Sequence, residues 1–245
     1  MSLNLASKTV VVLNDIKPAA DLLDRRSQLY SDRPRLIVCG ELATRGMMFT
    51  AARYGDVWRR MRSATHECFN SRASRRFRGI QETEAALLVS HLLRDPEHWN
   101  DHLKRSAASI VLSAVYGWPP LSPSEDHVVK RINDFIHKLA RTCVPGAYLV
   151  DIFPVMLYLP SWIAPWKRKA LQWFKEDSEM FLGLLNEAQQ KLVRFFSYNT
   201  RDERLNCFAQ RDGDSQQTFS AFLIENEEKT CLSKEEAAWL AGAML

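Results

Sequence analysis

The sequence predicts a mainly α-helical protein with a short β-strand near its amino terminus. From Asp56 onward, apolar residues recur at helical spacing in one segment after another, and Gly, Pro, Asn and Asp separate the segments. The motif S-K-E-E at Ser233–Glu236 has the pattern of a capping box and opens a last helix. One short run near the start, rich in β-branched residues, is the exception to the helical pattern.

The composition is that of a globular protein. The 245 residues suffice for one large domain or two small ones, and 46% are hydrophobic and 25% charged. The net charge of +4 is no argument for nucleic-acid binding. The five cysteines are scattered without a C-x-x-C pair, so a zinc site is not expected, and their odd number fits reduced thiols facing the cytosol. No apolar run is long enough for a signal peptide or a membrane span.

The first 53 residues are expected to hold few regular elements. The run TVVVL, residues 9–13, predicts a short strand that ends at Asn14-Asp15. Residues 17–30 follow helical spacing, with Pro18 near the helix start, and SDRP at 31–34 breaks that helix. Residues 35–53 are expected to form a loop with one short apolar run, LIVCG.

Four helices are predicted next, and breakers separate them; their ranges are 56–70, 72–94, 101–116 and 125–143. The third is apolar around much of its circumference near its carboxyl end, which is typical of a buried core helix.

Residues 145–166 contain four prolines, which exclude a regular helix across them. The segment also carries Tyr148, Phe153, Tyr158, Trp162 and Trp166. This much apolar surface is expected either to fold onto its own domain or to meet a lipid surface or a partner. A long amphipathic helix over 167–193, a short helix over 219–226 and the capped helix from Ser233 are expected to follow.

The stretch YGDVWRRMR, residues 54–62, places Trp58 and Arg62 four residues apart on one face of a helix. An indole N–H and a guanidinium are both hydrogen-bond donors and neither accepts. Such a face suits a carboxylate or a phosphate. The alternative for this stretch taken alone is a solvated basic helix with Trp58 half buried.

The order of these elements resembles the N-terminal half of a fungal cytochrome P-450, the haem-thiolate monooxygenases. The motifs that carry the resemblance are the W-x-x-x-R of YGDVWRRMR, the segment VDIFPVMLYLPSW and the final helix ending in LAGAML. Most of the chain fits that order. The resemblance implies a partial cytochrome P-450 fold, from helix B to the start of helix I, over residues 1–245 as an incomplete single domain.

The resemblance also implies the activity and the residues that serve it. Trp58 and Arg62 would donate to a propionate of haem b. The complete enzyme would insert one oxygen atom from O2 into an apolar small molecule, with electrons from an NADPH–cytochrome reductase, at the cytosolic face of the endoplasmic reticulum. The segment 151–166 would contact the membrane surface. Substrate contacts are expected from the loop 35–53 and from Val144, Tyr148, Ala241 and Gly242.

Several family features do not occur in this sequence. None of the five cysteines lies in the context F-x-x-G-x-R-x-C-x-G, which supplies the axial iron ligand, and E-x-x-R is absent. The oxygen-activating acid–Thr pair of helix I would lie beyond LAGAML, and the upstream membrane anchor is not present. The chain as given is therefore expected to lack a catalytic residue and a metal ligand and to be inactive, because the axial thiolate favours O–O cleavage.

Two alternatives to an enzyme remain. The chain could be a non-catalytic helical protein that binds lipid or a partner. Nucleic-acid binding through residues 72–78 and WRRMR is the weakest alternative, and no nucleic-acid partner is expected, because these arginines lack an interleaved aromatic platform and a solvated helix face explains them.

The segment 193–210 fits neither the family pattern nor the neighbouring helical period. Deleting it joins QQKL to RDGDSQQTFSAF, which resembles the family more closely, and codons for Val193 and Gln210 can supply the usual intron ends. We hypothesise a retained intron translated in frame as an exposed loop; the alternative is a genuine surface insertion.

Overall fold

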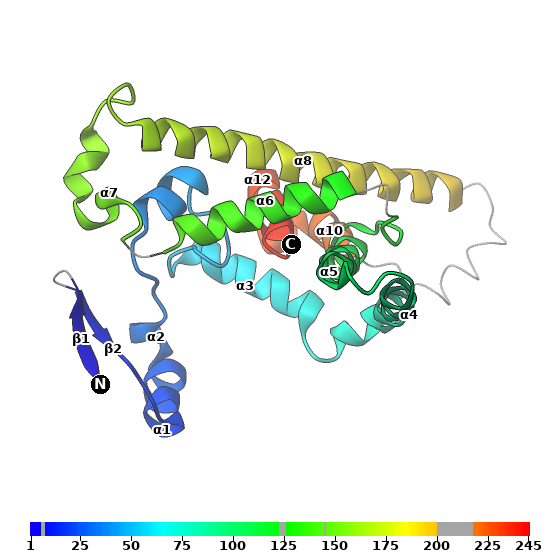
Figure 1. Cartoon of the computed structure of the whole chain (residues 1–245), viewed down its shortest axis with the longest axis horizontal. Helices are drawn as coiled ribbons and strands as arrows, with labels where there is room; N and C mark the ends of the chain where they lie inside the picture. Colours follow the sequence, from blue (N-terminus) through cyan, green and yellow to red (C-terminus); the bar gives the residue numbers. More distant parts are fainter. Residues whose placement is uncertain (6–7, 123–125, 145, 200–217) are drawn as a thin grey trace.

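The structure is a computed structural model that describes residues 1–245 except 6–7, 123–125, 145 and 200–217 (Figure 1). Its described part is mainly helical, as the sequence predicts. A two-stranded sheet lies at the amino terminus, and helices form the rest of the body.

The amino-terminal elements are shorter and more divided than expected. Strand β1 (Ser2–Leu5) pairs antiparallel with β2 (Lys8–Val11), so the strand expected at 9–13 is instead the second strand of a hairpin. The helix expected over 17–30 is divided into α1 (Ile16–Ala19), the π-helix η1 (Ala20–Arg25) and α2 (Ser27–Tyr30). None of these three elements has a buried residue, so no packed face holds them in one regular helix.

The four predicted helices are confirmed, with small shifts of their ends. They are α3 (Asp56–Phe69), α4 (Arg78–Arg94), α5 (Trp99–Tyr116) and α6 (Asp126–Thr142). The second differs at its start, where the 3-10 helix η3 (Ala73–Phe77) precedes α4. Helix α5 ends at Gly117, whose φ of 66° is in the left-handed region that glycine adopts without strain.

The expected loop 35–53 contains the π-helix η2 (Ile37–Ala43), which the sequence pattern does not predict. Ile37, Val38 and Cys39 are buried there, and burial stabilises a helical turn that has no periodic pattern of its own. The proline-rich segment is irregular, as expected, with only α7 (Leu149–Ile152) and the 3-10 helix η5 (Pro154–Tyr158).

The long helix α8 (Pro165–Asn199) begins slightly before and ends after its predicted range. The start of the hypothesised intron segment, residues 193–199, is thus helical. Residues 200–210 of that segment lie outside the described residues, so the intron hypothesis stays a prediction. Helices α10 (Phe219–Glu225), α11 (Glu227–Thr230) and α12 (Lys234–Gly242) follow.

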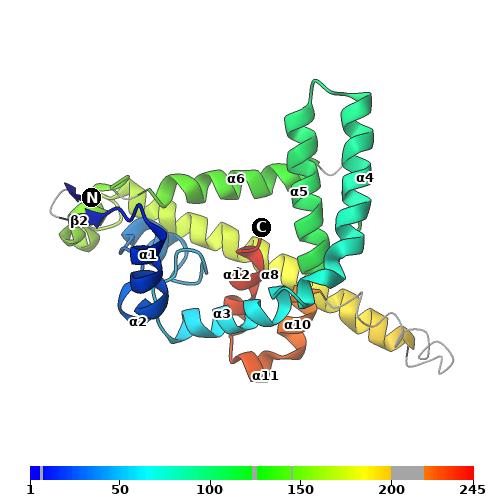
Figure 2. The same ribbon diagram turned by 90° about the horizontal axis from the view of Figure 1, so that it is seen from below.

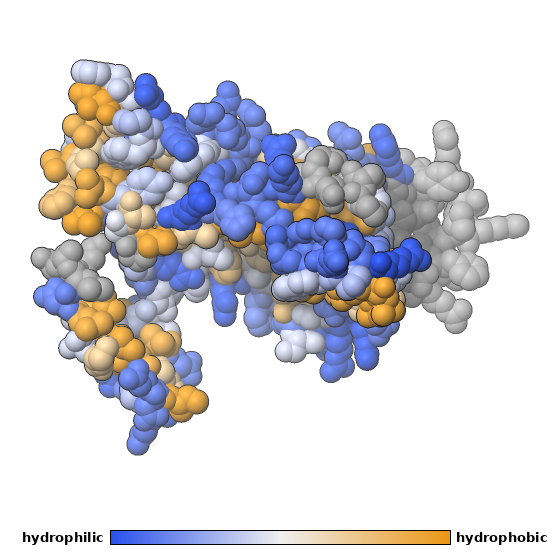
Figure 3. Space-filling view, in the orientation of Figure 1, coloured by the Kyte–Doolittle hydropathy of each residue, from blue (hydrophilic) through white to orange (hydrophobic). Residues whose placement is uncertain are grey.

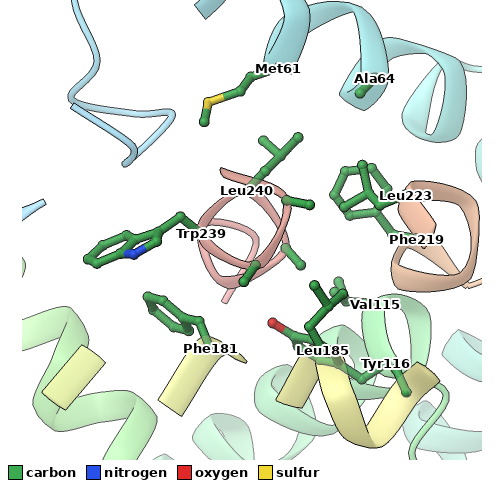
Figure 4. Packing of buried hydrophobic residues seen from close by; sticks show 14 of the residues in the cluster. Met61, Ala64, Val115, Tyr116, Phe181, Leu185, Phe219, Leu223, Trp239 and Leu240 are labelled. Carbon is green, nitrogen blue, oxygen red and sulfur yellow. The ribbon is translucent and has the colours of Figure 1, made fainter. Parts of the chain in front are cut away.

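Helix α12 lies at the centre of the main core, with α3, α5, α8 and α10 around it (Figures 1 and 4). Ser233 and Glu236 form the predicted capping box at its start. Trp239 is fully buried, packs its ring against Phe181 at 5.0 Å between centroids, and donates its indole N–H to Ser178 Oγ at 3.0 Å. The last turns of this helix are therefore core rather than surface.

Helices α4 and α5 form an antiparallel hairpin that projects from the body (Figure 2). A buried ion pair joins them, with Arg105 Nη2 2.9 Å from Glu84 Oε2, and the Ser109 hydroxyl donates to the other carboxylate oxygen. Arg105 also donates to the Leu121 carbonyl, and the Leu121 N–H donates to Ser109 Oγ. Through Leu121, the network joins the connection between α5 and α6 to the α4–α5 hairpin.

A second, smaller core lies where η2, α7 and the start of α8 meet. Its buried members are Ile37, Val38, Ala43, Val150 and Ala170. The buried carboxylate of Asp151 joins two of these elements, because its Oδ1 accepts the backbone N–H of Ile37 at 2.6 Å. Part of the apolar segment 145–166 thus folds onto its own domain.

Candidate functional site

Helix α3 packs one face against the main core, and its first turns remain partly exposed. Met61, Ala64 and Cys68 are buried against the main core at spacings of three and four residues, which sets the rotation of the helix. Trp58 lies one turn before Met61 and is half buried. Its ring packs against Phe49 at 6.1 Å and Tyr54 at 5.3 Å between centroids.

The three arginines that follow Trp58 have different surroundings. Arg59 pairs with Asp56 in the first turn, at 2.5 Å. Arg60 donates to the Cys231 carbonyl and contacts Glu236 at 3.3 Å, which joins α3 to the start of α12. Arg62 is exposed and has no ion pair or hydrogen bond within the described part of the chain. The indole N–H of Trp58 likewise has no acceptor among the described residues.

Trp58 and Arg62 therefore place on one helix two hydrogen-bond donors that have no acceptor among the residues the structure describes. Such a set can bind a carboxylate through a charge-assisted, forked contact from the guanidinium and a single bond from the indole. The half-buried Trp58 and exposed Arg62 also agree with the alternative of a solvated helix, so the contacts alone fit both interpretations.

A pocket of about 570 Å³ lies beside Trp58, between the loop 34–57 and Glu236 of α12. Residues of the expected substrate loop 35–53 line it, including Arg35, Glu41 and Arg45. Arg35 forms an ion pair with Glu41, and this contact raises the pKa of the guanidinium. The Arg45 guanidinium lies 4.2 Å above the centre of the Phe174 ring.

Arg45 lies in the loop 35–53 that the sequence analysis expects to contact substrate, but the sequence does not single it out within that loop. Its backbone has a positive φ of 46°, which the following Gly46 at 75° continues. The dipeptide Arg45-Gly46 gives a signal for a turn but none for the position of the arginine side chain.

The four other predicted substrate contacts do not line this pocket. Val144 is exposed, whereas Tyr148 is half buried against the second core, where burial raises the pKa of its hydroxyl. Ala241 and Gly242 are buried in the main core. None of these four residues lines the pocket beside Trp58, and their substrate role stays a prediction.

No group of three or more His, Cys, Asp or Glu side chains in the described part of the chain is arranged to hold a metal ion. None of the helices described has the length and apolarity needed to cross a membrane.

Comparisons with known proteins match the chain to one family. The family model for cytochrome P-450 matches residues 1–238. Cytochrome P-450 monooxygenase 58 of Postia placenta is 45% identical over 244 residues, which are 100% of this chain and 43% of that protein. A cytochrome P-450 monooxygenase of Armillaria gallica is 43% identical over the same shares of the two chains. The cytochrome P-450 monooxygenase iboC of Amanita muscaria is 33% identical over 99% of this chain and 39% of that protein. The chain thus spans less than half the length of the relatives it matches.

Proposed function

This chain belongs to the cytochrome P-450 family, and we propose that Trp58 and Arg62 of its helix α3 bind a propionate of haem b in a monooxygenase. The observation that carries the proposal is that the Arg62 guanidinium has no partner in the described part of the chain, whereas the two neighbouring arginines are already paired. Haem b, when bound, supplies the oxygen activation that inserts one oxygen atom into an apolar small molecule. The proposed electron donor is an NADPH–cytochrome reductase, and the proposed location is the cytosolic face of the endoplasmic reticulum.

The donor set fits a propionate in charge and in hydrogen-bonding capacity. A propionate offers two acceptor oxygens and one negative charge, whereas Trp58 and Arg62 offer donors and one positive charge. The stacked contact of Trp58 with Phe49 and its tilted contact with Tyr54 hold its ring in place before any ligand binds, which lowers the entropy cost of binding. The roles of these residues are to bind and orient; neither is proposed to react.

Comparing Arg62→Ala with Arg59→Ala tests this role. Residues 1–245 would be joined in frame to the remaining part of the Postia placenta relative, which supplies the rest of the family's length. Loss of one charged donor to a buried carboxylate costs about 1–3 kcal/mol, so Arg62→Ala should weaken haem binding roughly 5- to 150-fold. Haem released per polypeptide, measured against apomyoglobin as acceptor, gives the comparison.

Arg59→Ala is the matched control because Arg59 is on the same helix but pairs with Asp56 at the surface. Arg60 is a poorer control, since its loss also breaks the contact between α3 and Glu236. Equal haem retention in Arg62→Ala and Arg59→Ala would reject the propionate role and favour the solvated helix.

A second proposed property is contact of the segment 151–166 with a membrane surface. Around α7 and η5, apolar side chains gather on the surface in the upper left of Figure 3. The exposed apolar residues of this region, called the α7 patch below, are Leu149, Ile152, Phe153, Val155, Tyr158, Trp162 and Ile163. Trp and Tyr are suited to the interface of a bilayer. This surface is also what the non-catalytic, lipid-binding alternative would use.

Flotation with liposomes of phosphatidylcholine and phosphatidylserine tests this property. Phe153, Val155 and Trp162 changed together to Ser should abolish flotation, because these side chains are exposed and not part of a core. Leu157 is unsuitable for the triple variant because it packs against the second core. The matched control changes Val89, Leu93 and Trp99, which are exposed on the α4–α5 hairpin. Unaltered flotation of the α7 patch variant would refute the assignment.

A further inference from the structure

Two cysteines that lie far apart in the sequence meet at the second core. Cys39 is on η2, and Cys143 directly follows α6. Their sulfur atoms are 2.8 Å apart, although 104 residues separate them along the chain. A disulfide bond is about 2.05 Å long, so the two sulfurs are less than 1 Å from bonding distance.

Hydrogen bonds anchor the backbone segments that carry the two cysteines. On one side, Asp151 Oδ1 accepts the N–H groups of Ile37 and Val38, at 2.6 and 3.4 Å, and so fixes the start of η2. On the other side, the backbone N–H of Cys143 donates to the Leu139 carbonyl at 2.9 Å, which continues the hydrogen-bond pattern of α6. The contact is therefore between two anchored elements.

We propose that Cys39 and Cys143 form a redox-modification site, which a low-molecular-weight disulfide such as oxidised glutathione converts to a protein disulfide that ties η2 to the carboxyl end of α6. The pair is distinct from the haem-propionate residues on α3, and the disulfide does not depend on haem binding.

The surroundings of the two thiols assign different roles to them. The hydrogen bond from Cys39 lowers the pKa of Cys143, which is also the more accessible of the two. The same bond and burial raise the pKa of Cys39, whose side chain is fully buried. Because the thiolate is the nucleophile in exchange, Cys143 reacts first with an external disulfide and Cys39 resolves the product.

The reaction has two exchange steps. The Cys143 thiolate attacks one sulfur of oxidised glutathione, its S–S bond breaks, and one glutathione thiolate leaves with the electron pair. Cys39 then loses its proton to that thiolate and attacks Cys143 Sγ, which expels the second glutathione. Two protein thiols are oxidised by two electrons, one oxidised glutathione is reduced to two thiols, and the protons are conserved.

The disulfide would fix the chain next to the α7 patch. Val144 directly follows the site, and Tyr148 lies where α7 packs on η2. Oxidation would thus hold the α6–α7 connection against η2, whereas in the reduced protein the two elements can separate without breaking a covalent bond.

Peptide mapping of the folded 245-residue chain tests the proposal. The protein is incubated with oxidised glutathione, free thiols are alkylated, and the digest is analysed by mass spectrometry with and without dithiothreitol. We expect a linked peptide pair containing Cys39 and Cys143 in most molecules, released by dithiothreitol. Cys39→Ser should instead stop at a glutathione adduct on Cys143.

Cys68→Ser is the matched control, because Cys68 is also buried but lies on α3 in the main core. This variant should form the same linked pair as the unmodified sequence. Glutathione adducts without a Cys39–Cys143 link, or a link that forms equally with the exposed Cys231, would overturn the proposal.

The thermal midpoint gives a second readout that needs no variant. Closing a loop between residues 39 and 143 restricts the unfolded chain, so oxidation should raise the midpoint by roughly 5 °C or more. Reduction should return it to the starting value. If oxidation leaves the thermal midpoint unchanged or lowers it, the disulfide distorts the fold. That result would overturn the proposal that Cys39 and Cys143 form a redox-modification site.

Discussion

Replacing Gly242 by Ala should destabilise the main core. A Cβ atom at this position would lie 2.4, 2.6 and 2.7 Å from three carbons of the Phe181 ring. These distances are far below van der Waals contact, so either the ring or helix α12 must move. Gly242 therefore allows α12 to approach α8 closely, and this packing role is what the structure shows for a residue expected from the sequence to contact substrate.

The magnitude follows from how little room Phe181 has. Its side chain is fully buried, and its ring has edge contacts with Phe135 at 5.1 Å and Trp239 at 5.0 Å between centroids. A methyl group forced into a filled core costs about 1–3 kcal/mol. For a chain of this size each kcal/mol lowers the thermal midpoint by about 2–4 °C, so Gly242→Ala should lower it by roughly 2–12 °C.

Thermal unfolding followed by circular dichroism measures the effect, and Gly183→Ala is the matched control. Gly183 is exposed in the middle of α8, and a Cβ there would meet nothing within 4 Å. The same substitution should therefore stabilise the protein at this position by about 0.4–1 kcal/mol. Opposite signs for the two variants are expected. A midpoint that rises in Gly242→Ala as it does in Gly183→Ala would refute the close approach of the two helices.

Three further predictions concern ion pairs and haem. Glu84→Ala leaves the buried Arg105 guanidinium without its counter-charge and should lower the free energy of unfolding by about 3–5 kcal/mol in urea titration, whereas replacing both residues by Leu should cost much less. The Arg53 guanidinium, and then the Tyr54 N–H, lower the pKa of Asp32 from 3.8 to about 2, so its stabilisation is present above pH 3.8 and lost as the pH falls towards 2. The stability difference between Asp32→Asn and the unmodified chain should shrink over that range, and a constant difference would contradict it. The 245-residue polypeptide should give no ferrous–CO band of a thiolate-ligated haem, since none of its cysteines has the family's ligand context; observing the band would show that another cysteine can serve.

The features that the sequence predicts correctly are those set by near neighbours. The capping box of Ser233 and Glu236 depends on residues three apart. Helix positions followed from apolar spacing and from breakers such as Gly117, whose left-handed backbone ends α5. In each case the physical cause lies within about one turn of the residue concerned.

The features that the sequence does not predict depend on contacts between distant segments. Nothing in the pattern indicates that Glu84 pairs with Arg105, since several charges on each helix could have served. The π-helix η2 has no helical period, and its burial and the carboxylate of Asp151 hold it. The role of Gly242 depends on where α12 crosses α8, which local pattern does not set.

The contact of Asp151 with η2 has a consequence for synthesis of the chain. Asp151 follows Ile37 by 114 residues. Because a ribosome adds about 5–20 residues per second, Asp151 is synthesised roughly 6–23 s after Ile37. During that interval Ile37, Val38 and Cys39, all buried in the finished fold, have no core to enter. The nascent chain therefore keeps a short apolar segment without its core until α7 and the start of α8 have been made, and η2 forms its native contacts after the helices that lie between them in the sequence.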